Sequence, residues 1–327
     1  MKVLVTGGAG FVGSHLAAAL VARGDRVRVL RRANSCLIAL ERLPVEHAIG
    51  DILDETAVAA AVTGCELVFH VAALSSYWRA RPEDVYRVNV EGTRIVMDAC
   101  VRAGVPRVVH TSSVAAVGIA QNGGPANEDT PFDRISATFV YADSKHRAEA
   151  EVYRAIERGL DAVIVNPAAV IGAGDHHLIS SSTVVEFARR NVPAVPAGGM
   201  CVADVAAVVH GHLAAAERGR VGERYILGGE NLTHRQLAEI IVGLAGRPIP
   251  RFTIPRWALG PAAVAVDAFN RVSHRPPVVN GEQIRLSGVD FFFDSSKAVR
   301  ELGYPLMPTC GAIEKAYIWY REHGYLT

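Results

Sequence analysis

A tyrosine and a lysine stand four positions apart in "YADSK", residues 141–145, at the start of a helix-like stretch. Residues i and i+4 share one face of an α-helix, so Tyr141 and Lys145 can point into the same cleft. A free tyrosine, with a pKa of about 10, is a poor base, but a neighbouring ammonium and a cationic nicotinamide would lower that pKa. The pair could then exchange a proton with a substrate oxygen while nicotinamide exchanges a hydride. The alternative is the polar first turn of a surface helix.

A hydroxyl that orients the substrate oxygen should lie near this pair. The segment "HTSSVA" ends a predicted strand and carries Ser112 and Ser113. Successive strand residues point to opposite faces, so only one of the two serines is expected to face a cofactor. Their alternative role is to cap the backbone at the end of the strand.

A glycine-rich turn follows the first predicted strand in "VLVTGGAGFVGSHL". Gly7 would permit the tight turn, Gly10 would let the backbone approach a pyrophosphate, and Gly13 would let the helix pack closely. The helix N-terminus would supply unpaired N–H groups to the phosphates. The turn therefore predicts a dinucleotide site in the first strand–helix connection.

The end of the second predicted strand should meet the adenosine ribose. An acidic residue there would bind the 2′-hydroxyl of NAD, whereas arginine would favour the 2′-phosphate of NADP. Arg31 and Arg32 stand at this point without an acid, so NADP(H) is favoured, and NAD(H) beside two solvated arginines stays open. Asp51, just past the third strand, could reach the adenine or cap the next turn.

The order of elements predicts an α/β fold of the Rossmann type, a doubly wound parallel sheet with a smaller, irregular C-terminal substrate lobe. We expect a dinucleotide-binding domain over 1–166, joined by 203–229, and a substrate lobe over 167–202 and 230–327. Strands are expected at 3–6, 26–30, 45–49, 67–71, 107–111, 162–165 and 224–229, and helices at 14–23, 55–62, 82–103, 144–158, 205–217, 235–244 and 313–323.

Composition narrows the function classes. The 327 residues carry a net charge of +1, which gives no electrostatic footprint for nucleic acid, and no apolar run is long enough to span a membrane. The start "MKVLVTGG" reads as a strand, which predicts no signal peptide. Five widely spaced cysteines form no CxxC pair and are expected to be reduced thiols of a cytoplasmic protein. The expected partner is a small molecule.

The chain resembles the extended short-chain dehydrogenase/reductases, also called the NAD-dependent epimerase/dehydratase family. The segments "TGGAGFVGSHL", "GDILD", "VFHVAA", "VNVEGT", "VVHTSSVA", "YADSK" and "VNPAAVIG" match its landmarks in order. The resemblance implies that Ser113, Tyr141 and Lys145 are catalytic and that Asn89 is a structural asparagine. It also implies cofactor contacts from Gly7, Gly10, Phe11, Val12, Gly13, Arg31, Arg32, Asp51, Ile52, Ala72, Ala73, Thr111, Pro167 and Val170.

Within the family the chain is most similar to the dihydroflavonol-4-reductase-like branch and to hopanoid-associated sugar epimerases. This similarity places Ser75, Tyr77 and Trp78 near the substrate together with Ser113; aromatic packing is the alternative for Tyr77 and Trp78. One departure is "MCVADVA", where Cys201 and Ala203 replace a usual histidine and aspartate. That departure argues against the usual sugar-nucleotide pocket. His176 and His177 suggest a metal only weakly, because no ligand partners stand nearby, so no metal is expected.

Three functions follow as hypotheses. The first is NADP(H)-dependent interconversion of a carbonyl and an alcohol on an apolar substrate, including a 3β-hydroxysteroid dehydrogenase-like reaction. Apolar segments such as 257–269 are consistent with such a pocket, and equally with a helix packed in the core. The second is a nucleotide-sugar epimerase that keeps NAD tightly bound. The third is a non-catalytic NADP(H) sensor, against which the intact Ser–Tyr–Lys set argues.

The resemblance also implies a homodimer through helices near 82–103 and 144–158.

Overall fold

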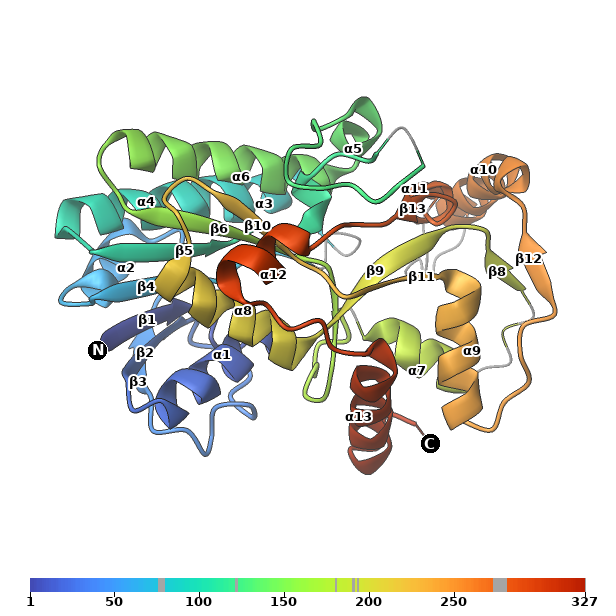
Figure 1. Cartoon of the computed structure of the whole chain (residues 1–327), viewed down its shortest axis with the longest axis horizontal. Helices are drawn as coiled ribbons and strands as arrows, with labels where there is room; N and C mark the ends of the chain where they lie inside the picture. Colours follow the sequence, from blue (N-terminus) through green and yellow to red (C-terminus); the bar gives the residue numbers. More distant parts are fainter. Residues whose placement is uncertain are drawn as a thin grey trace.

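The computed structural model describes residues 1–75, 80–120, 123–179, 181–189, 192, 194–272 and 281–326. Its centre is a parallel sheet of seven strands in the order β10-β6-β5-β4-β1-β2-β3 (Figure 1). The expected doubly wound α/β class is confirmed. The strands are β1 (Lys2–Thr6), β2 (Arg26–Arg31), β3 (Glu46–Ile49), β4 (Leu67–His70), β5 (Arg107–Thr111), β6 (Ala162–Pro167) and β10 (Arg224–Leu227).

Helices cover both faces of this sheet. One face is packed by α1 (Phe11–Ala22) and α8 (Val205–Arg218), and the other by α2 (Glu55–Val62), α4 (Gly92–Ala103) and α6 (Val140–Glu157). The side chains of Val3 and Val5 join the first core, and Leu4 between them joins the second. This alternation follows from the two-residue period of a strand, and it requires apolar residues on both sides of a buried strand.

Two helix expectations need correction. The helix expected at 144–158 begins at Val140, so Tyr141 and Lys145 both lie inside α6. The helix expected at 82–103 is not one regular α-helix. It consists of α3 (Pro82–Tyr86), a π-helical turn η2 (Arg87–Glu91) and α4. The wider π turn contains Asn89, and such turns are frequent at functional sites.

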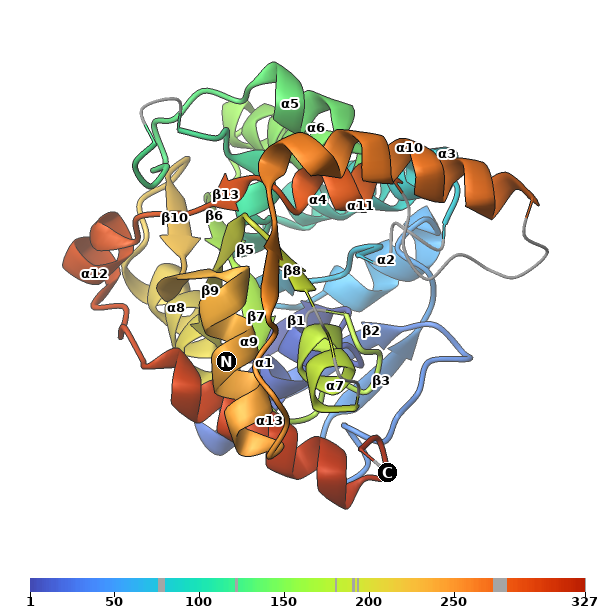
Figure 2. The ribbon, with the colours of Figure 1, turned by 90° about the vertical axis from the view of Figure 1, so that its right-hand side faces the viewer.

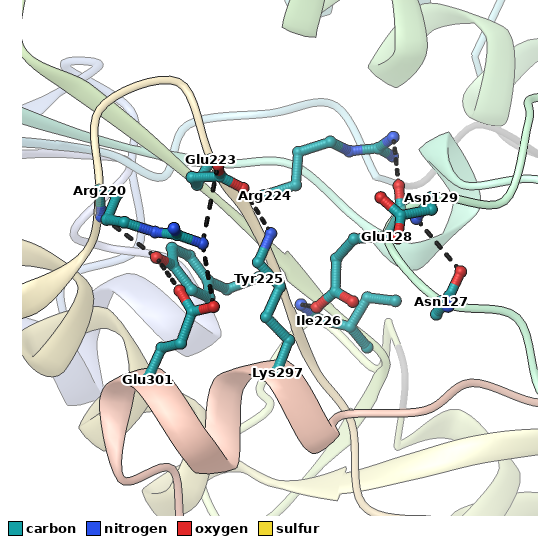
Figure 3. A network of polar contacts seen from close by, with 10 residues as sticks. All are labelled: Asn127, Glu128, Asp129, Arg220, Glu223, Arg224, Tyr225, Ile226, Lys297 and Glu301. Atoms are coloured by element: carbon teal, nitrogen blue, oxygen red, sulfur yellow. Dashed lines mark hydrogen bonds and ion pairs between the residues drawn. The ribbon is translucent and has the colours of Figure 1, made fainter.

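Strand β10 closes one edge of the sheet, as the sequence predicts for "RYILGG". Polar contacts from distant segments hold it there (Figure 3). The Glu128 carboxylate accepts a hydrogen bond of 2.8 Å from the Ile226 amide, and the Tyr225 hydroxyl donates to Glu301 at 2.9 Å. Glu301 lies in α12 (Ser296–Leu302), which also brings Lys297 to Glu223 at 2.6 Å. These contacts use side chains to fix an edge strand that has a strand neighbour on one side only.

The C-terminal part contains small sheets that the sequence analysis missed. Strand β9 (Gly199–Asp204) pairs with β7 (Ala169–Ile171), β11 (Glu230–Thr233) and β13 (Asp290–Phe291), and β8 (Ala194–Pro196) pairs with β12 (Phe252–Ile254). The remaining helices are α5 (Arg134–Thr138), α7 (Ser182–Arg189), α9 (His234–Leu244), α10 (Arg256–Val272), α11 (Gly281–Leu286) and α13 (Thr309–Glu322), with a 3-10 turn η3 (Val114–Ala116).

A capping box of Thr233 and Gln236 is present at the start of α9. Helices α7, α9 and α13 bury a core of their own against β9 and β7, through Ile171, Val202, Leu237 and Ile313. Figure 2 shows α10 on the outer edge of the molecule, above α11. The C-terminal part therefore lies beyond the carboxyl ends of the central strands, where ligands bind in open α/β sheets.

Candidate active site

The α6 helix brings Tyr141 to the serine at the end of β5. Tyr141 and Ser113 share a side-chain hydrogen bond. The neighbouring Ser112 is buried and donates instead to the Glu149 carboxylate at 2.5 Å. The two serines thus point in opposite directions, as alternation predicts, and Ser113 is the one beside the tyrosine.

Burial raises the pKa of Tyr141, and the hydrogen bond with Ser113 only partly offsets this effect. The sequence predicts a pKa of Tyr141 that is lowered by Lys145 together with a cationic nicotinamide, and this combined effect stays a prediction. Burial dominates because it disfavours the phenolate. A tyrosine with a raised pKa keeps its proton at neutral pH, and this suits a proton donor better than a base.

Lys145 lies one helical turn from Tyr141 and is 1% exposed. Its ammonium donates a hydrogen bond of 2.7 Å to the backbone carbonyl oxygen of Thr111. Burial lowers the pKa of Lys145 to about 8, and the Glu149 carboxylate acts in the opposite direction. The hydroxyl of Thr111 contacts His212 in α8 at 3.0 Å, so the backbone of Thr111 rather than its side chain meets Lys145.

Glu149, a further turn along α6, is 3% exposed and lies at the centre of a buried polar cluster. Besides Ser112, it accepts a hydrogen bond of 2.8 Å from the Asn166 amide, and its other oxygen lies 3.1 Å from the Arg224 guanidinium. Asn166 also donates to the carbonyl of Ser113 at 2.9 Å. The buried charge of Glu149 is compensated, and its cluster fixes the strand end that carries both serines.

Asn89 joins the loop after β4 to the start of α6. Its side-chain oxygen accepts from the Leu74 amide at 2.7 Å, and its side-chain nitrogen donates to the Leu74 carbonyl at 3.3 Å and to the Ser144 hydroxyl at 3.0 Å. Ser144 in turn donates to the carbonyl of Tyr141 at 2.7 Å. Through these contacts Asn89 ties the loop after β4 to the start of α6, and this is the structural role that the resemblance implies.

A buried histidine lies beneath this loop. His70 contacts the hydroxyls of Thr6 at 2.8 Å and Thr93 at 3.0 Å, and Thr93 donates to the carbonyl of Asn89 at 2.6 Å. Thr93 must then accept from Nε2 of His70, so His70 is the neutral tautomer with its proton on Nε2. Burial lowers the pKa of His70 to about 3, which agrees with a neutral ring.

The glycine turn has the geometry that a dinucleotide requires. Gly7 has φ of +68°, and a Cβ there would lie 2.7 Å from the backbone of Ala72. A Cβ on Gly13 would lie 2.3 Å from the carbonyl oxygen of Gly7. Gly10 is the N-cap of α1 and brings no capping side chain, and the first turn holds no acidic residue. The N–H groups at this helix end therefore fit a pyrophosphate.

Arg31 and Arg32 lie at the end of β2, beyond the glycine turn. Arg31 donates to His47 at 3.2 Å and to the carbonyl of Arg32 at 3.2 Å. Among the described residues, no carboxylate forms an ion pair with either guanidinium. The side chain of Asp51 accepts from the Leu53 amide at 3.0 Å and so caps the following turn, and Ile52 is buried against Gly92.

The remaining predicted contacts surround the same strand ends. Ala72 donates its amide to Thr6 at 3.2 Å, and Ala73 and Ser75 follow in this loop. Pro167 ends β6, and Val170 in β7 is buried. Phe11 and Val12 begin α1 and are half-buried. Tyr77 and Trp78 lie outside the described residues.

One argument about the substrate lobe changes. Cys201 and Ala203 are buried in β9, where the thiol of Cys201 accepts from the Gly229 amide at 3.4 Å. Both residues pack in the core, so their presence in place of the usual histidine and aspartate does not argue against a sugar-nucleotide pocket. His176 packs edge-on against Trp319, and the described residues contain no group of three or more metal-ligating side chains. No described helix is long and apolar enough to cross a membrane.

Sequence reasoning missed Glu149, Arg224, His70 and Thr93. Glu149 had a local signal, because it stands four residues after Lys145 on the same helix face. Arg224 had none, since its contact with Glu149 joins segments that are distant in sequence. The apolar segment 257–269 is divided in the structure, because Leu259 and Ala263 are buried whereas Trp257, Val264 and Phe269 are exposed.

A doubly wound parallel sheet with this glycine turn defines a dinucleotide-binding α/β protein. The chain belongs to the NAD-dependent epimerase/dehydratase family, whose model matches residues 3–228. It is an enzyme of the extended short-chain dehydrogenase/reductase type, which works with NAD(P). The family resemblance stated from the sequence is thereby confirmed.

Three relatives are similar along almost the whole chain. A putative dihydroflavonol 4-reductase of Synechocystis sp. is 37% identical over 98% of this chain and 95% of its own. Sterol demethylase protein B of Methylococcus capsulatus is 37% identical over 100% of both chains. A 3β-hydroxysteroid dehydrogenase/Δ5→4-isomerase of Mycobacterium tuberculosis is 31% identical over 98% of this chain and 90% of its own.

Solved structures share the fold. The crystal structure of gox2253 is 39% identical, covers 100% of this chain and 99% of its own, and has a TM-score of 0.89. The dTDP-glucose 4,6-dehydratase DesIV of Streptomyces venezuelae, with NAD bound, is 26% identical over 98% of this chain and 97% of its own, with a TM-score of 0.79.

Proposed function

We propose that the protein is an NADP(H)-dependent oxidoreductase that interconverts a carbonyl and an alcohol on an apolar substrate. The observation that carries this proposal is the hydrogen bond between Tyr141 and Ser113 beside the buried Lys145. In reduction, both hydroxyls bind the carbonyl oxygen and Tyr141 donates its proton to it. When bound, the cofactor supplies the hydride to the carbon. Lys145 compensates the charge that is left on the phenolate.

The cofactor would lie along the carboxyl ends of β1, β2, β4 and β5. The uncapped N-terminus of α1 binds the pyrophosphate, and Lys145 has two N–H donors besides the one given to Thr111, which suits the ribose hydroxyls. Arg31 and Arg32 are unpaired with carboxylates in the described part of the chain, and this supports NADP over NAD. Residues 1–166 with 203–229 form the dinucleotide domain in this proposal, and 167–202 with 230–327 the substrate lobe.

The names of the relatives support an apolar substrate. One is called a dihydroflavonol reductase, one a sterol demethylase protein and one a hydroxysteroid dehydrogenase. In this proposal the nicotinamide lies between the loop after β4, which contains Ser75, and the end of β5, which leads to Ser113. The 3β-hydroxysteroid reaction is the same chemistry on a particular ring alcohol.

Nucleotide-sugar chemistry is the second candidate. It is favoured by the similarity to a dTDP-glucose dehydratase and by the burial of Cys201 and Ala203, which removes an argument against a sugar pocket. An epimerase would keep its NAD bound through purification and would show no net consumption of NADPH.

The test combines cofactor titration with a substrate screen. NADPH and NADH are titrated by fluorescence, and ketones, hydroxysteroids, dihydroflavonols and UDP-sugars are then screened for net redox change. Tyr141→Phe should abolish turnover with NADPH affinity unchanged, and Tyr317→Phe at a half-buried position of α13 serves as the control. Turnover by Tyr141→Phe close to the unmodified rate would contradict the proposal.

A further inference from the structure

Helix α10 exposes one continuous apolar stripe along its length. Trp257 is 81% exposed, Val264 64%, Phe269 68% and Val272 79%. Pro261, Ala265 and Ala268 are exposed between them. The spacing of three to four residues places all seven side chains on one face of the helix. A stripe of this size on a described surface marks an interaction site rather than scattered apolar residues.

The opposite face of α10 holds the helix on the protein. Leu259 is 4% exposed and Ala263 is fully buried. Asp267 accepts from the Gly281 amide at 2.7 Å and lies 3.5 Å from the Arg285 guanidinium of α11. The helix is therefore anchored through this face, and it lies at the outer edge of the molecule (Figure 2).

The segment before α10 extends the same surface with apolar and basic residues. Ile249 is 53% exposed and Phe252 66%. Arg247 and Arg251 are exposed between them, and no carboxylate of the described residues pairs with either. Between 244 and 272 the sequence holds one acidic residue, Asp267, which is half-buried and pairs with Arg285. The exposed surface is thus apolar with an excess of positive charge.

We propose that this surface docks the protein on a membrane that contains anionic lipid. A protruding helix with Trp and Phe on one face and arginines beside it suits the interfacial plane, where aromatic rings enter the acyl boundary and arginines meet lipid phosphates. A protein partner would need a groove that accepts a convex helix, and the positive charge of Arg247 and Arg251 favours the surface of anionic lipid. The helix lies in the interface and does not span the membrane.

The docked surface is connected to the active site. The Glu282 carboxylate in α11 accepts a hydrogen bond from the backbone amide of Val140, the residue before Tyr141. Docking through α10 therefore holds the membrane on the side of the molecule where α6 begins. The inference goes beyond the proposed function and does not depend on it, because vesicle binding needs neither cofactor nor substrate.

The experiment is cosedimentation of the full chain with vesicles of phosphatidylcholine alone and with about 30% phosphatidylglycerol. We expect binding to the anionic vesicles and weak binding to the neutral ones. The double variant Trp257→Ser/Phe269→Ser should lower the vesicle partition coefficient by about tenfold or more. Arg247→Gln/Arg251→Gln should remove the preference for anionic vesicles.

The matched control is Val221→Ser/Leu306→Ser, which removes two exposed apolar side chains elsewhere and should bind as the unmodified chain does. Thermal unfolding checks that every variant is folded. Equal partition of the stripe variant and the control would overturn the proposal, and so would no vesicle binding at all. Self-association in light scattering that the stripe variant abolishes, without vesicle binding, would assign the stripe to a second copy of the chain instead.

Discussion

The ammonium of Lys145 donates a hydrogen bond of 2.7 Å to the carbonyl oxygen of Thr111, and the carboxylate of Glu149, one turn further along α6, raises the lysine pKa. The lysine is thereby held at the end of β5, next to the strand residues that lead to Ser113. The imidazoles of His70 and His110 also lie near Lys145. Burial lowers the pKa of both histidines, so both rings are neutral at neutral pH and above.

This relationship predicts a pH dependence. Lys145 has a pKa of about 8, so its charge is lost as the pH rises through that value. If the charged form assists proton transfer, kcat/KM for reduction falls above about pH 8. Glu149→Gln removes the group that raises the lysine pKa and should move this limb to lower pH. A limb unchanged from the unmodified enzyme would contradict the role of Glu149, and Glu157→Gln at the exposed end of α6 is the control.

A second prediction concerns stability. The folded pKa of Lys145 lies below its ordinary value of 10.5, so the unfolded chain binds more protons between those values. The charged lysine therefore lowers the free energy of unfolding below pH 8, and this penalty disappears as the pH rises toward 10.5. Lys145→Met should be more stable than the unmodified protein at about pH 7, by roughly 1–3 kcal/mol. Urea unfolding should show a smaller difference at about pH 9.5, and an unchanged difference would be the opposing result.

Gly7 should tolerate no side chain. Its φ of +68° and the backbone of Ala72 at 2.7 Å both oppose a Cβ. We expect Gly7→Ala to lose about 3 kcal/mol of stability and to abolish NADPH binding. Gly24 has φ of +88° with nothing within 4 Å, so Gly24→Ala should lose only about 1 kcal/mol and bind normally. Equal behaviour of the two variants would show that the contact with Ala72 has no effect.

Arg31 should set the cofactor preference. Replacing it with aspartate removes a partner of the 2′-phosphate and adds a repelling charge, so NADPH should bind about 10- to 100-fold more weakly. NADH should bind equally well or better. Arg26→Asp makes the same charge change at the exposed start of the same strand and should leave the ratio of the two dissociation constants unchanged. An unaltered ratio in Arg31→Asp would contradict the arginine argument.

Asn89 should contribute more to stability than Ser144. Asn89→Ala leaves the buried N–H and C=O of Leu74 without their partner, which is expected to lose about 2–3 kcal/mol. Ser144→Ala removes one hydrogen bond to Asn89 and should lose about 1 kcal/mol. Thermal unfolding compares the stability of the two variants. A larger loss in Ser144→Ala would contradict the proposal that Asn89 holds the loop after β4 through Leu74.

The sequence alone determined the order of the strands and helices of the central sheet, the glycine turn, and the expectation that only one of Ser112 and Ser113 faces the cofactor. Each of these depends on a local period or on one residue type. Apolar residues alternate along a strand, side chains four apart share a helix face, and glycine alone accepts the backbone at position 7 without strain. The extension of α6 back to Val140 was missed because helix ends are weakly specified by local residues.

Only the tertiary structure decided what depends on burial and on distant segments. The raised pKa of Tyr141 follows from the depth at which α6 packs, and composition does not report that depth. The ion pair of Glu149 with Arg224 requires β10 to lie beside β6, and the pairing of β9 with three strands joins segments that no local pattern connects. The apolar residues of α10 read equally as pocket lining or core, because periodicity shows that a face exists but not what it faces.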